Sequence, residues 1–300
     1  MKVIYTYIDP NDENYIKPET LVYGLWSILQ TSKFYSDIVL YTSEPLLNKF
    51  KQIEVLKIDY RLLEVPRPFS TGYLPKLYTH LQQEEEYIHL DLDLILFQPL
   101  IDKKNSPVVF THREIDLNWG LSLVNAYREC YFDPAEYYNK KYGLGYNQNL
   151  VFDTIPNVGI AHVKDIPLFK SCVEDALYEY HSEQFFFEQL DSRFCYLEQA
   201  LIHKYLLERS ESYFKSIQSS DYLAFHNSIV VDSLKGIDIN NLPAIHFKGI
   251  SKNLTRNNVV AIDAVISMIG KSKFLDILNV FNIKNFYPFK VYQRYSTGMG

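Results

Sequence analysis

The run YIHLDLDLILF, residues 87–97, is apolar except for one histidine and two aspartates, Asp91 and Asp93. Its length and its leucine and isoleucine content predict a buried β-strand. A buried carboxylate that has no partner is costly, so a core strand does not normally carry two of them. The two aspartates therefore need a partner, and the identity of that partner decides how the rest of the chain is interpreted.

The segments before this run alternate between strand and helix patterns. We expect strands at Val3–Ile8, Ile38–Tyr41 and Ile53–Ile58, and helices at Pro18–Thr31, Glu44–Lys51 and Gly72–Gln83. Such alternation predicts a parallel sheet with helices on both of its faces. The fold class is therefore α/β, with a mixed, mostly parallel sheet.

The remainder of the chain is less regular. We expect strands at Pro107–Thr111, Val158–Val163 and Ala244–Phe247, helices at Pro167–His181, Tyr196–Arg209 and Val259–Phe281, and a helix with a loop at 133–149. The sequence has no internal repeat and no segment with the composition of a linker. We therefore predict one catalytic domain over residues 1–262, followed by a helical, basic appendage over residues 263–300.

The charge distribution excludes general nucleic-acid binding and singles out the end of the chain. The 300 residues carry a net charge of −6, with 47% hydrophobic and 22% charged residues, which is typical of a soluble globular protein. Residues 265–300 contain five basic side chains and one acidic side chain, so this segment is at +4 and the remainder is at −10. A basic, aromatic tail suits peripheral contact with an anionic membrane, or it is a packed helix with solvated lysines.

The cysteines and the start of the chain indicate a cytoplasmic location. The cysteines number 3 and have no metal-ligand spacing, which fits a reducing compartment. The opening residues, MKVIYTYIDPNDENY, turn polar after one short strand and do not resemble a signal peptide. No apolar run is long enough to cross a membrane.

The two aspartates of the opening run fit a divalent-cation site. Side chains two residues apart in a strand point to the same side, so Asp91 and Asp93 can reach one place beyond the carboxyl end of the strand. Ligands bind at that edge in open α/β sheets, and paired carboxylates suit Mg²⁺ or Mn²⁺ that also holds a diphosphate. Two other interpretations stay open: a pair of solvated or turn-capping aspartates, and a phosphatase with Asp91 as nucleophile.

At this point the chain resembles the GT-A fold glycosyltransferases, and most closely glycosyltransferase family 8. Four further stretches carry the resemblance together with the Asp-x-Asp pair, and they span roughly residues 1–256: DENY, LPKLY, PNVGI with the later YLEQALIHKY, and HFKGISK. The family's usual Pro-Trp after the final lysine is absent, since Asn253 and Leu254 stand there. The segment between Asp93 and Asn157 is long and tyrosine-rich, so the resemblance does not carry acceptor contacts over.

The resemblance implies a donor site built from several of these stretches. Tyr15 would stack on the nucleotide base and Asp12 or Asn14 would contact base or ribose, with Asp9 as a competing candidate. The same DENY segment also fits an ordinary Asx turn. Lys76, on the helix before the Asp-x-Asp strand, would lie near the donor sugar and diphosphate.

The later stretches are matched to the third metal ligand and to the reacting sugar. In HFKGISK, His246 would complete the metal set of Asp91 and Asp93, Gly249 would let the backbone pass the diphosphate, and Lys252 would bind phosphate oxygens. Three further residues would lie near the reacting sugar carbon in the role of catalytic residues: Asn157, Glu198 and Gln199.

The function implied is transfer of a sugar, as by a hexosyltransferase, from a UDP-sugar to an acceptor hydroxyl. Mn²⁺ or Mg²⁺ would be the cofactor, the anomeric configuration would be retained, and the acceptor would be a glycan, a glycolipid or a protein. The alternatives are a non-catalytic sugar-nucleotide-binding protein of the same fold, the Asp-x-Asp phosphatase, and a membrane-surface adaptor built around the basic tail.

Overall fold

The computed structural model describes residues 1–9, 11–66, 74–100, 106–113, 156–182, 202–213, 228–231, 242, 244–247 and 253–296. The segment 133–149, expected to hold a helix and a loop, lies outside this range. Within it the chain forms two compact units, one of residues 1–64, 88–100 and 227–300 and the other of residues 65–87 and 101–226.

A six-stranded sheet is the main element of the fold. Its strand order is β3-β2-β1-β4-β7-β6, with bounds Lys2–Tyr7 (β1), Asp37–Thr42 (β2), Asp59–Leu62 (β3), Tyr87–Leu90 (β4), Val108–Arg113 (β6) and Pro156–Val163 (β7). Strand β2 pairs in parallel with both β1 and β3, whereas β6 and β7 are antiparallel. This mixed, mostly parallel arrangement with flanking helices confirms the predicted α/β fold class.

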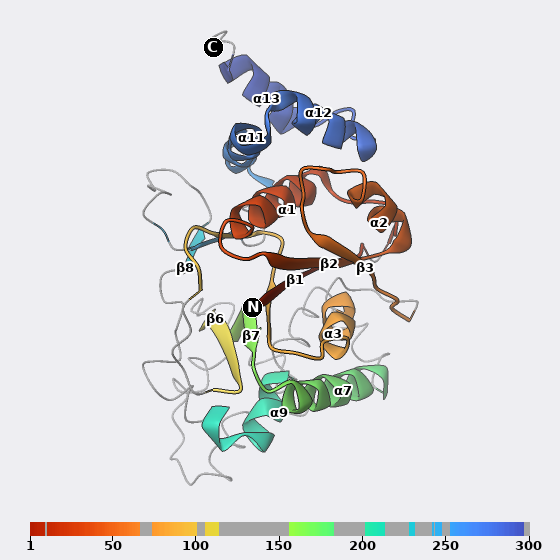
Figure 1. Cartoon of the computed structure of the whole chain (residues 1–300), viewed down its shortest axis with the longest axis vertical. Helices are drawn as coiled ribbons and strands as arrows, with labels where there is room; N and C mark the ends of the chain where they lie inside the picture. The colour runs from red at the N-terminus through yellow and green to blue at the C-terminus, as the bar shows by residue number, and fades with distance from the viewer. Residues whose placement is uncertain are drawn as a thin grey trace. The chain divides into compact units, whose positions relative to one another are not determined.

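In the first unit, helices α1 (Pro18–Thr31) and α2 (Glu44–Phe50) lie on one side of strands β1 to β3 (Figure 1). Helix α1 begins at a proline, whose fixed φ and missing N–H suit the first helical turn. Most of α1 is buried, because it packs against the C-terminal helix α11 and against strand β5 (Leu94–Leu96). Helix α1 is therefore a core element, and it bears directly on the site described below.

The opening run does not form one strand. Strand β4 ends at Leu90, residues 92 and 93 are in a turn, and the chain resumes as β5 (Leu94–Leu96) in a second, three-stranded sheet. In that sheet β9 (Ala244–Phe247) pairs antiparallel with β5 and parallel with β8 (Ser228–Val231). The expectation of a single strand over 87–97 is therefore wrong, because the chain changes sheets at the two aspartates.

The expected third strand over 53–58 is also wrong. That segment is a series of turns in which the N–H of Leu56 donates to the carbonyl of Ile53 at 3.1 Å, and both side chains are buried. The strand begins only at Asp59. The apolar pattern of this segment therefore reflects two buried side chains three residues apart, not a strand. The polar residues of β3 fit its position at the edge of the sheet.

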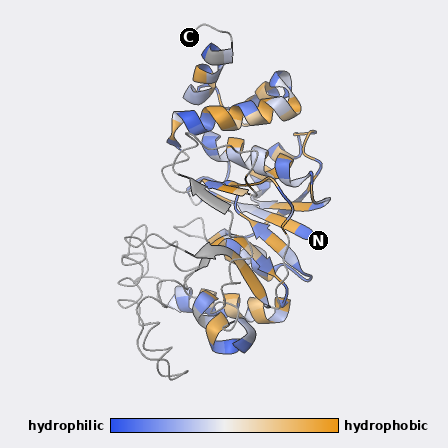
Figure 2. Cartoon of the chain, turned by 90° about the vertical axis from the view of Figure 1, so that its left-hand side faces the viewer, coloured by the Kyte–Doolittle hydropathy of each residue, from blue (hydrophilic) through white to orange (hydrophobic). Residues whose placement is uncertain are grey.

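The C-terminal part of the first unit is a group of three helices, α11 (Thr255–Ile269), α12 (Lys271–Val280) and α13 (Tyr287–Ser296) (Figure 1). Each carries both hydrophobic and hydrophilic residues (Figure 2). The single helix expected over 259–281 is divided at Gly270, whose φ of 84° and ψ of 152° are accessible essentially to glycine alone. Helix α11 spans residue 262, and the predicted domain boundary at that position stays a prediction.

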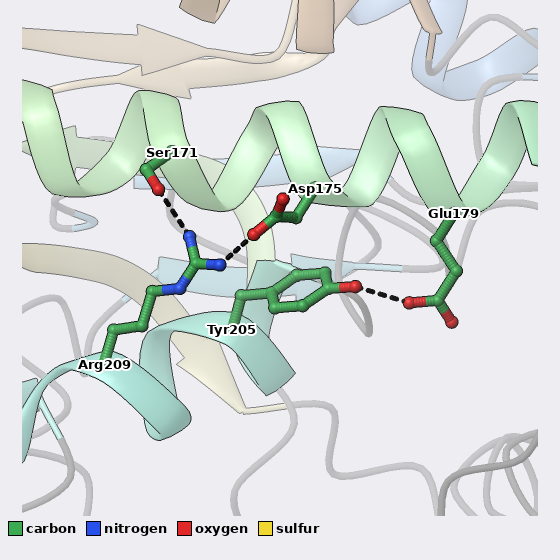
Figure 3. Close-up of polar contacts among 5 residues, drawn as sticks. All are labelled: Ser171, Asp175, Glu179, Tyr205 and Arg209. Carbon is green, nitrogen blue, oxygen red and sulfur yellow. Dashed lines mark hydrogen bonds and ion pairs between the residues drawn. The ribbon is translucent and has the colours of Figure 1, made fainter.

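The second unit is built around α7 (Ile166–Ser182), which packs against α3 (Leu74–Leu81) and α9 (Ile202–Arg209) (Figure 1). Figure 3 shows how α9 is held: Arg209 donates to Ser171 Oγ at 2.5 Å and pairs with Asp175, and Tyr205 donates to Glu179 at 2.6 Å. The three α7 residues are spaced by four, so they share one helix face. This row of contacts fixes α9 along α7.

Candidate metal and donor site

The turn between β4 and β5 places two carboxylates directly after a buried strand. Leu90 and Leu94 on either side of the turn have no exposed surface, and the N–H of Leu94 donates to the Asp91 carbonyl at 3.0 Å. Asp91 is half-buried and Asp93 is 9% exposed. The two aspartates thus come together through a turn beyond the carboxyl end of β4, rather than through the two-residue repeat of a strand.

Strand pairing brings the third group, His246, to the same turn although it lies over 150 positions away in the sequence. In the antiparallel pair of β5 and β9, His246 is in register with Leu94, and the N–H of Phe247 donates to the Asp93 carbonyl at 3.0 Å. The His246 side chain is 6% exposed. Its Nε2 lies 3.4 Å from Asp93 Oδ1 and 3.9 Å from Asp91 Oδ2.

The geometry of these three side chains fits a divalent cation. One ligand atom from each of them lies within 4.8 Å of the others. Ligands about 2.1 Å from an octahedral ion are about 3.0 Å apart in adjacent positions and about 4.2 Å apart in opposite ones, so small side-chain shifts would close the set. Two carboxylates in a largely buried place also need positive charge nearby. The cluster of Asp91, Asp93 and His246 can therefore hold a metal ion, as the sequence predicts.

Helix α1 packs against the turn between β4 and β5. Ser27 Oγ donates to the Leu94 carbonyl at 2.5 Å, and the buried Tyr5 hydroxyl contacts Ser27 Oγ at 3.0 Å. A Cβ placed on Gly24 would lie 3.1 Å from Leu92 Cδ2, so glycine permits the close approach of the helix to the turn. These supporting residues were not predicted from the sequence. An isolated glycine inside a helical pattern was the available signal, since it often marks close packing.

The DENY segment forms a turn in the loop after β1, the neighbour of β4 in the sheet. Asp12 Oδ1 accepts the N–H of Asn14 at 2.8 Å, and the Asp12 carbonyl accepts the N–H of Tyr15 at 3.1 Å. The nearby Asp9 is nearly buried, and its Oδ1 accepts the N–H of Asn11 at 2.9 Å. The Asx-turn interpretation is therefore correct as far as local structure goes.

This turn is also anchored to helix α2. Ser43 Oγ donates to the Glu13 carbonyl and Lys49 Nζ donates to the Asn14 carbonyl, both at 2.7 Å. Tyr15 keeps 46% of its surface exposed. A fixed backbone that presents an exposed aromatic ring is suited to stacking on a planar ligand.

The other predicted site residues are less closely defined. Lys76 is half-buried on α3 in the second unit, and Asn157 lies near the start of β7, in register with His112 of β6. Four residues lie outside the part of the chain that the structure describes: Glu198, Gln199, Gly249 and Lys252. Their predicted roles stay predictions.

No protein family matches the sequence, and no curated protein matches it. Among solved structures, the chain is similar to the glycosyltransferase GlyE of Streptococcus pneumoniae TIGR4, with 12% identity and a TM-score of 0.47, over 92% of this chain and 63% of that one. The apo form of GlyE gives 11% identity and a TM-score of 0.44 over the same shares. The apo structure of the bifunctional glycosyltransferase WbbM gives 12% identity and a TM-score of 0.48, over 93% of this chain and 51% of that one.

The chain thus spans less than two thirds of the length of these structures. Similarity at this level carries no activity over to the chain, so its function has to be inferred from its own residues. Of the helices in the described ranges, none combines the length and the apolar character needed to cross a bilayer.

Proposed function

We propose that the protein is a metal-dependent glycosyltransferase that moves a sugar from a nucleotide-diphosphate sugar to an acceptor hydroxyl. The observation that carries the proposal is the cluster of Asp91, Asp93 and His246 beyond the carboxyl end of β4. Its two carboxylates and one imidazole form a ligand set in which oxygen predominates, and carboxylates suit Mn²⁺ or Mg²⁺. Three protein ligands leave positions open for diphosphate oxygens.

The chemistry of such a site depends on charge. A bound divalent cation would neutralise the donor diphosphate and act as a Lewis acid on the leaving group. Lys252, and Lys76 if it reaches the donor, would add positive charge through their ammonium groups. Fixed charges aimed at the departing diphosphate would supply much of the rate enhancement, because charge develops there as the glycosidic bond breaks.

The finer assignments rest on the resemblance to glycosyltransferase family 8. They are a UDP-sugar donor, stacking of its base on Tyr15, and transfer of a hexose with retention of anomeric configuration. The exposure of the Tyr15 ring and the anchoring of its loop support the stacking. Asn157 would face the donor and acceptor sugars. Glu198 and Gln199 would lie under the reacting sugar carbon, where either could stabilise developing positive charge.

Donor hydrolysis tests the proposal without knowledge of the acceptor. The full-length protein is incubated with a panel of UDP-sugars and Mn²⁺, and free UDP is measured. We expect slow release of UDP from one or a few donors, abolished by EDTA and by Asp93→Asn, with a circular dichroism spectrum unchanged by the substitution. Release of UDP that persists in EDTA and in Asp93→Asn would contradict the metal-dependent mechanism.

The same assay separates the alternatives. Binding of UDP without turnover of any donor, even when candidate acceptors are added, would identify a sugar-nucleotide-binding protein. Cleavage of simple phosphomonoesters with a phospho-aspartate at Asp91 would identify the phosphatase.

Location and membrane contact are separate proposals. In α12 and α13 the phenylalanines Phe274 and Phe289 are buried, whereas Lys271, Lys273 and Lys290 are exposed. These two phenylalanines therefore pack inward, and the exposed lysines form a charged surface that is suited to anionic headgroups. Co-sedimentation with anionic liposomes, with and without residues 270–300, tests this contact, and we keep a cytoplasmic location as a prediction.

A further inference from the structure

Tyr23 of helix α1 lies against the cation site but is not one of its ligands. Its side chain is fully buried, and its ring packs on the ring of Phe247 with centroids 4.6 Å apart and planes tilted by 38°. Phe247 follows His246 and donates its N–H to the Asp93 carbonyl. The next residue of the helix, Gly24, is the one that approaches Leu92 of the turn. Tyr23 therefore packs against the residue that follows His246, and the next residue of its helix packs against the turn that carries Asp91 and Asp93.

The Tyr23 hydroxyl has no hydrogen-bond partner within the described part of the chain, although it is buried. A buried hydroxyl without a hydrogen-bond partner destabilises the folded protein, and such groups call for a functional explanation. Burial, and after it the negative charge of Asp93 and then of Glu19, raises the pKa of the Tyr23 phenol. The phenol is thus a protonated donor that lies within electrostatic reach of Asp93.

We propose that Tyr23 is a positioning residue of the cation site, and that its hydroxyl donates a hydrogen bond to the Asp93 carboxylate when the cation is bound. This inference rests on the proposed function, because it requires that Asp91, Asp93 and His246 hold a cation. Asp93 Oδ1 faces His246 Nε2 at 3.4 Å, which is the side on which the cation would lie. The other carboxylate oxygen can then accept a hydrogen bond from the Tyr23 hydroxyl.

The physical reason for such a bond is the orientation of the ligand. A carboxylate can rotate about its Cβ–Cγ bond, and a hydrogen bond to the oxygen that does not coordinate the cation fixes the one that does. Loss of such a supporting contact typically lowers metal affinity about 10–100-fold. A hydrogen bond that the Tyr23 hydroxyl makes to a cation-bound Asp93 carboxylate satisfies a buried donor, so the hydrogen bond and cation binding stabilise each other.

The variant Tyr23→Phe tests the inference, because it keeps the ring that packs on Phe247 and removes only the hydroxyl. Binding of Mn²⁺ to the full-length protein is measured by the electron paramagnetic resonance signal of the free ion, and the thermal unfolding of each protein is measured in EDTA. We expect an affinity for Mn²⁺ about 10–100-fold lower in Tyr23→Phe than in the wild type. The cation-free melting temperature should be unchanged or higher, since an unsatisfied buried hydroxyl is removed.

The matched control is Glu19→Gln, which alters the other carboxylate whose charge acts on Tyr23. It should leave the affinity for Mn²⁺ within about twofold of the wild-type value, a limit far below the effect of a supporting contact. Equal Mn²⁺ affinity in Tyr23→Phe and wild type would overturn the inference and leave the cation site intact. A wild-type protein that binds no Mn²⁺, with or without UDP, would overturn the proposed cation site itself and this inference with it.

Discussion

The buried histidine of α9 gives a prediction about acid stability that can be worked out quantitatively. His203 is 4% exposed, and its Nδ1 lies 2.8 Å from the hydroxyl oxygen of Tyr213, which is also buried. Burial lowers the pKa of His203 to about 3 from the ordinary value of 6.5. The unfolded chain therefore takes up a proton below pH 6.5 that the folded protein does not bind until about pH 3. Protonation of His203 therefore does not affect the free energy of unfolding well above pH 6.5, and it lowers that free energy increasingly as the pH falls below 6.5.

The size of the effect follows from the two pKa values. Proton linkage gives a loss of about 2 kcal/mol in the free energy of unfolding between pH 7 and pH 5 from this one group. The variant His203→Asn removes the titration and retains an amide that can bond to the Tyr213 hydroxyl. Its loss between the two pH values should be smaller than that of the wild type by about 2 kcal/mol.

Urea unfolding at pH 7 and pH 5 measures this difference directly. Any packing defect from the substitution is present at both pH values and cancels. The control is Ser182→Ala at the exposed end of α7, which removes no titrating group and should lose as much stability as the wild type does. If His203→Asn and the wild type lose equal stability between pH 7 and pH 5, the assignment of a buried, neutral histidine is refuted.

Three further predictions concern the site, a helix junction and the contact between α7 and α9. Asp93→Asn should lower the affinity for Mn²⁺ at least about 100-fold, because loss of a metal ligand costs more affinity than loss of a supporting contact. The melting temperature in EDTA should stay equal or rise. An unchanged affinity for Mn²⁺ would show that Asp93 is not a ligand. Gly270→Ala should destabilise the protein by about 1–3 kcal/mol in urea unfolding, since φ is 84° and no atom lies within 4 Å of the added Cβ, so strain is purely that of the backbone; no loss would contradict this conformation. Arg209→Ala should lower the free energy of unfolding by about 1–2 kcal/mol, because it removes a partly exposed ion pair with Asp175 and a cation–π contact 5.2 Å from the Tyr205 ring. A double-mutant cycle with Asp175→Ala measures the contribution of the ion pair, and a coupling energy of zero would show that the pair contributes nothing.

The elements predicted best from sequence are those with strong local signals. Helix α1 has the predicted bounds, because Pro18 sets its start and a helical repeat of apolar residues follows. The predicted elements were wrong where contacts with distant parts of the chain determine the local structure. Ile53 and Leu56 are buried although their segment forms turns and not a strand. The pattern of apolar residues over six positions does not distinguish a turn with buried side chains from a strand.

The residues of the candidate site could be predicted from the sequence, but the strand pairing that brings them together could not. The two aspartates were identified from their place in an apolar run, and the histidine of HFKGISK from the resemblance to glycosyltransferase family 8. The three side chains do meet in space. That the chain changes sheets at the aspartates, and that β9 pairs with β5 to bring His246 to them, depends on strand pairing between distant segments. Nothing in the sequence near Tyr23 marks it as a neighbour of this site, because its position follows from how α1 packs.

The most direct test of the account is a crystal of the full-length protein soaked with Mn²⁺ and UDP, with diffraction data collected at the manganese absorption edge. We expect one anomalous peak about 2.2 Å from carboxylate oxygens of Asp91 and Asp93 and from His246 Nε2, with diphosphate oxygens completing the coordination. A manganese ion bound to other residues, or a nucleotide bound away from these three side chains, would contradict it.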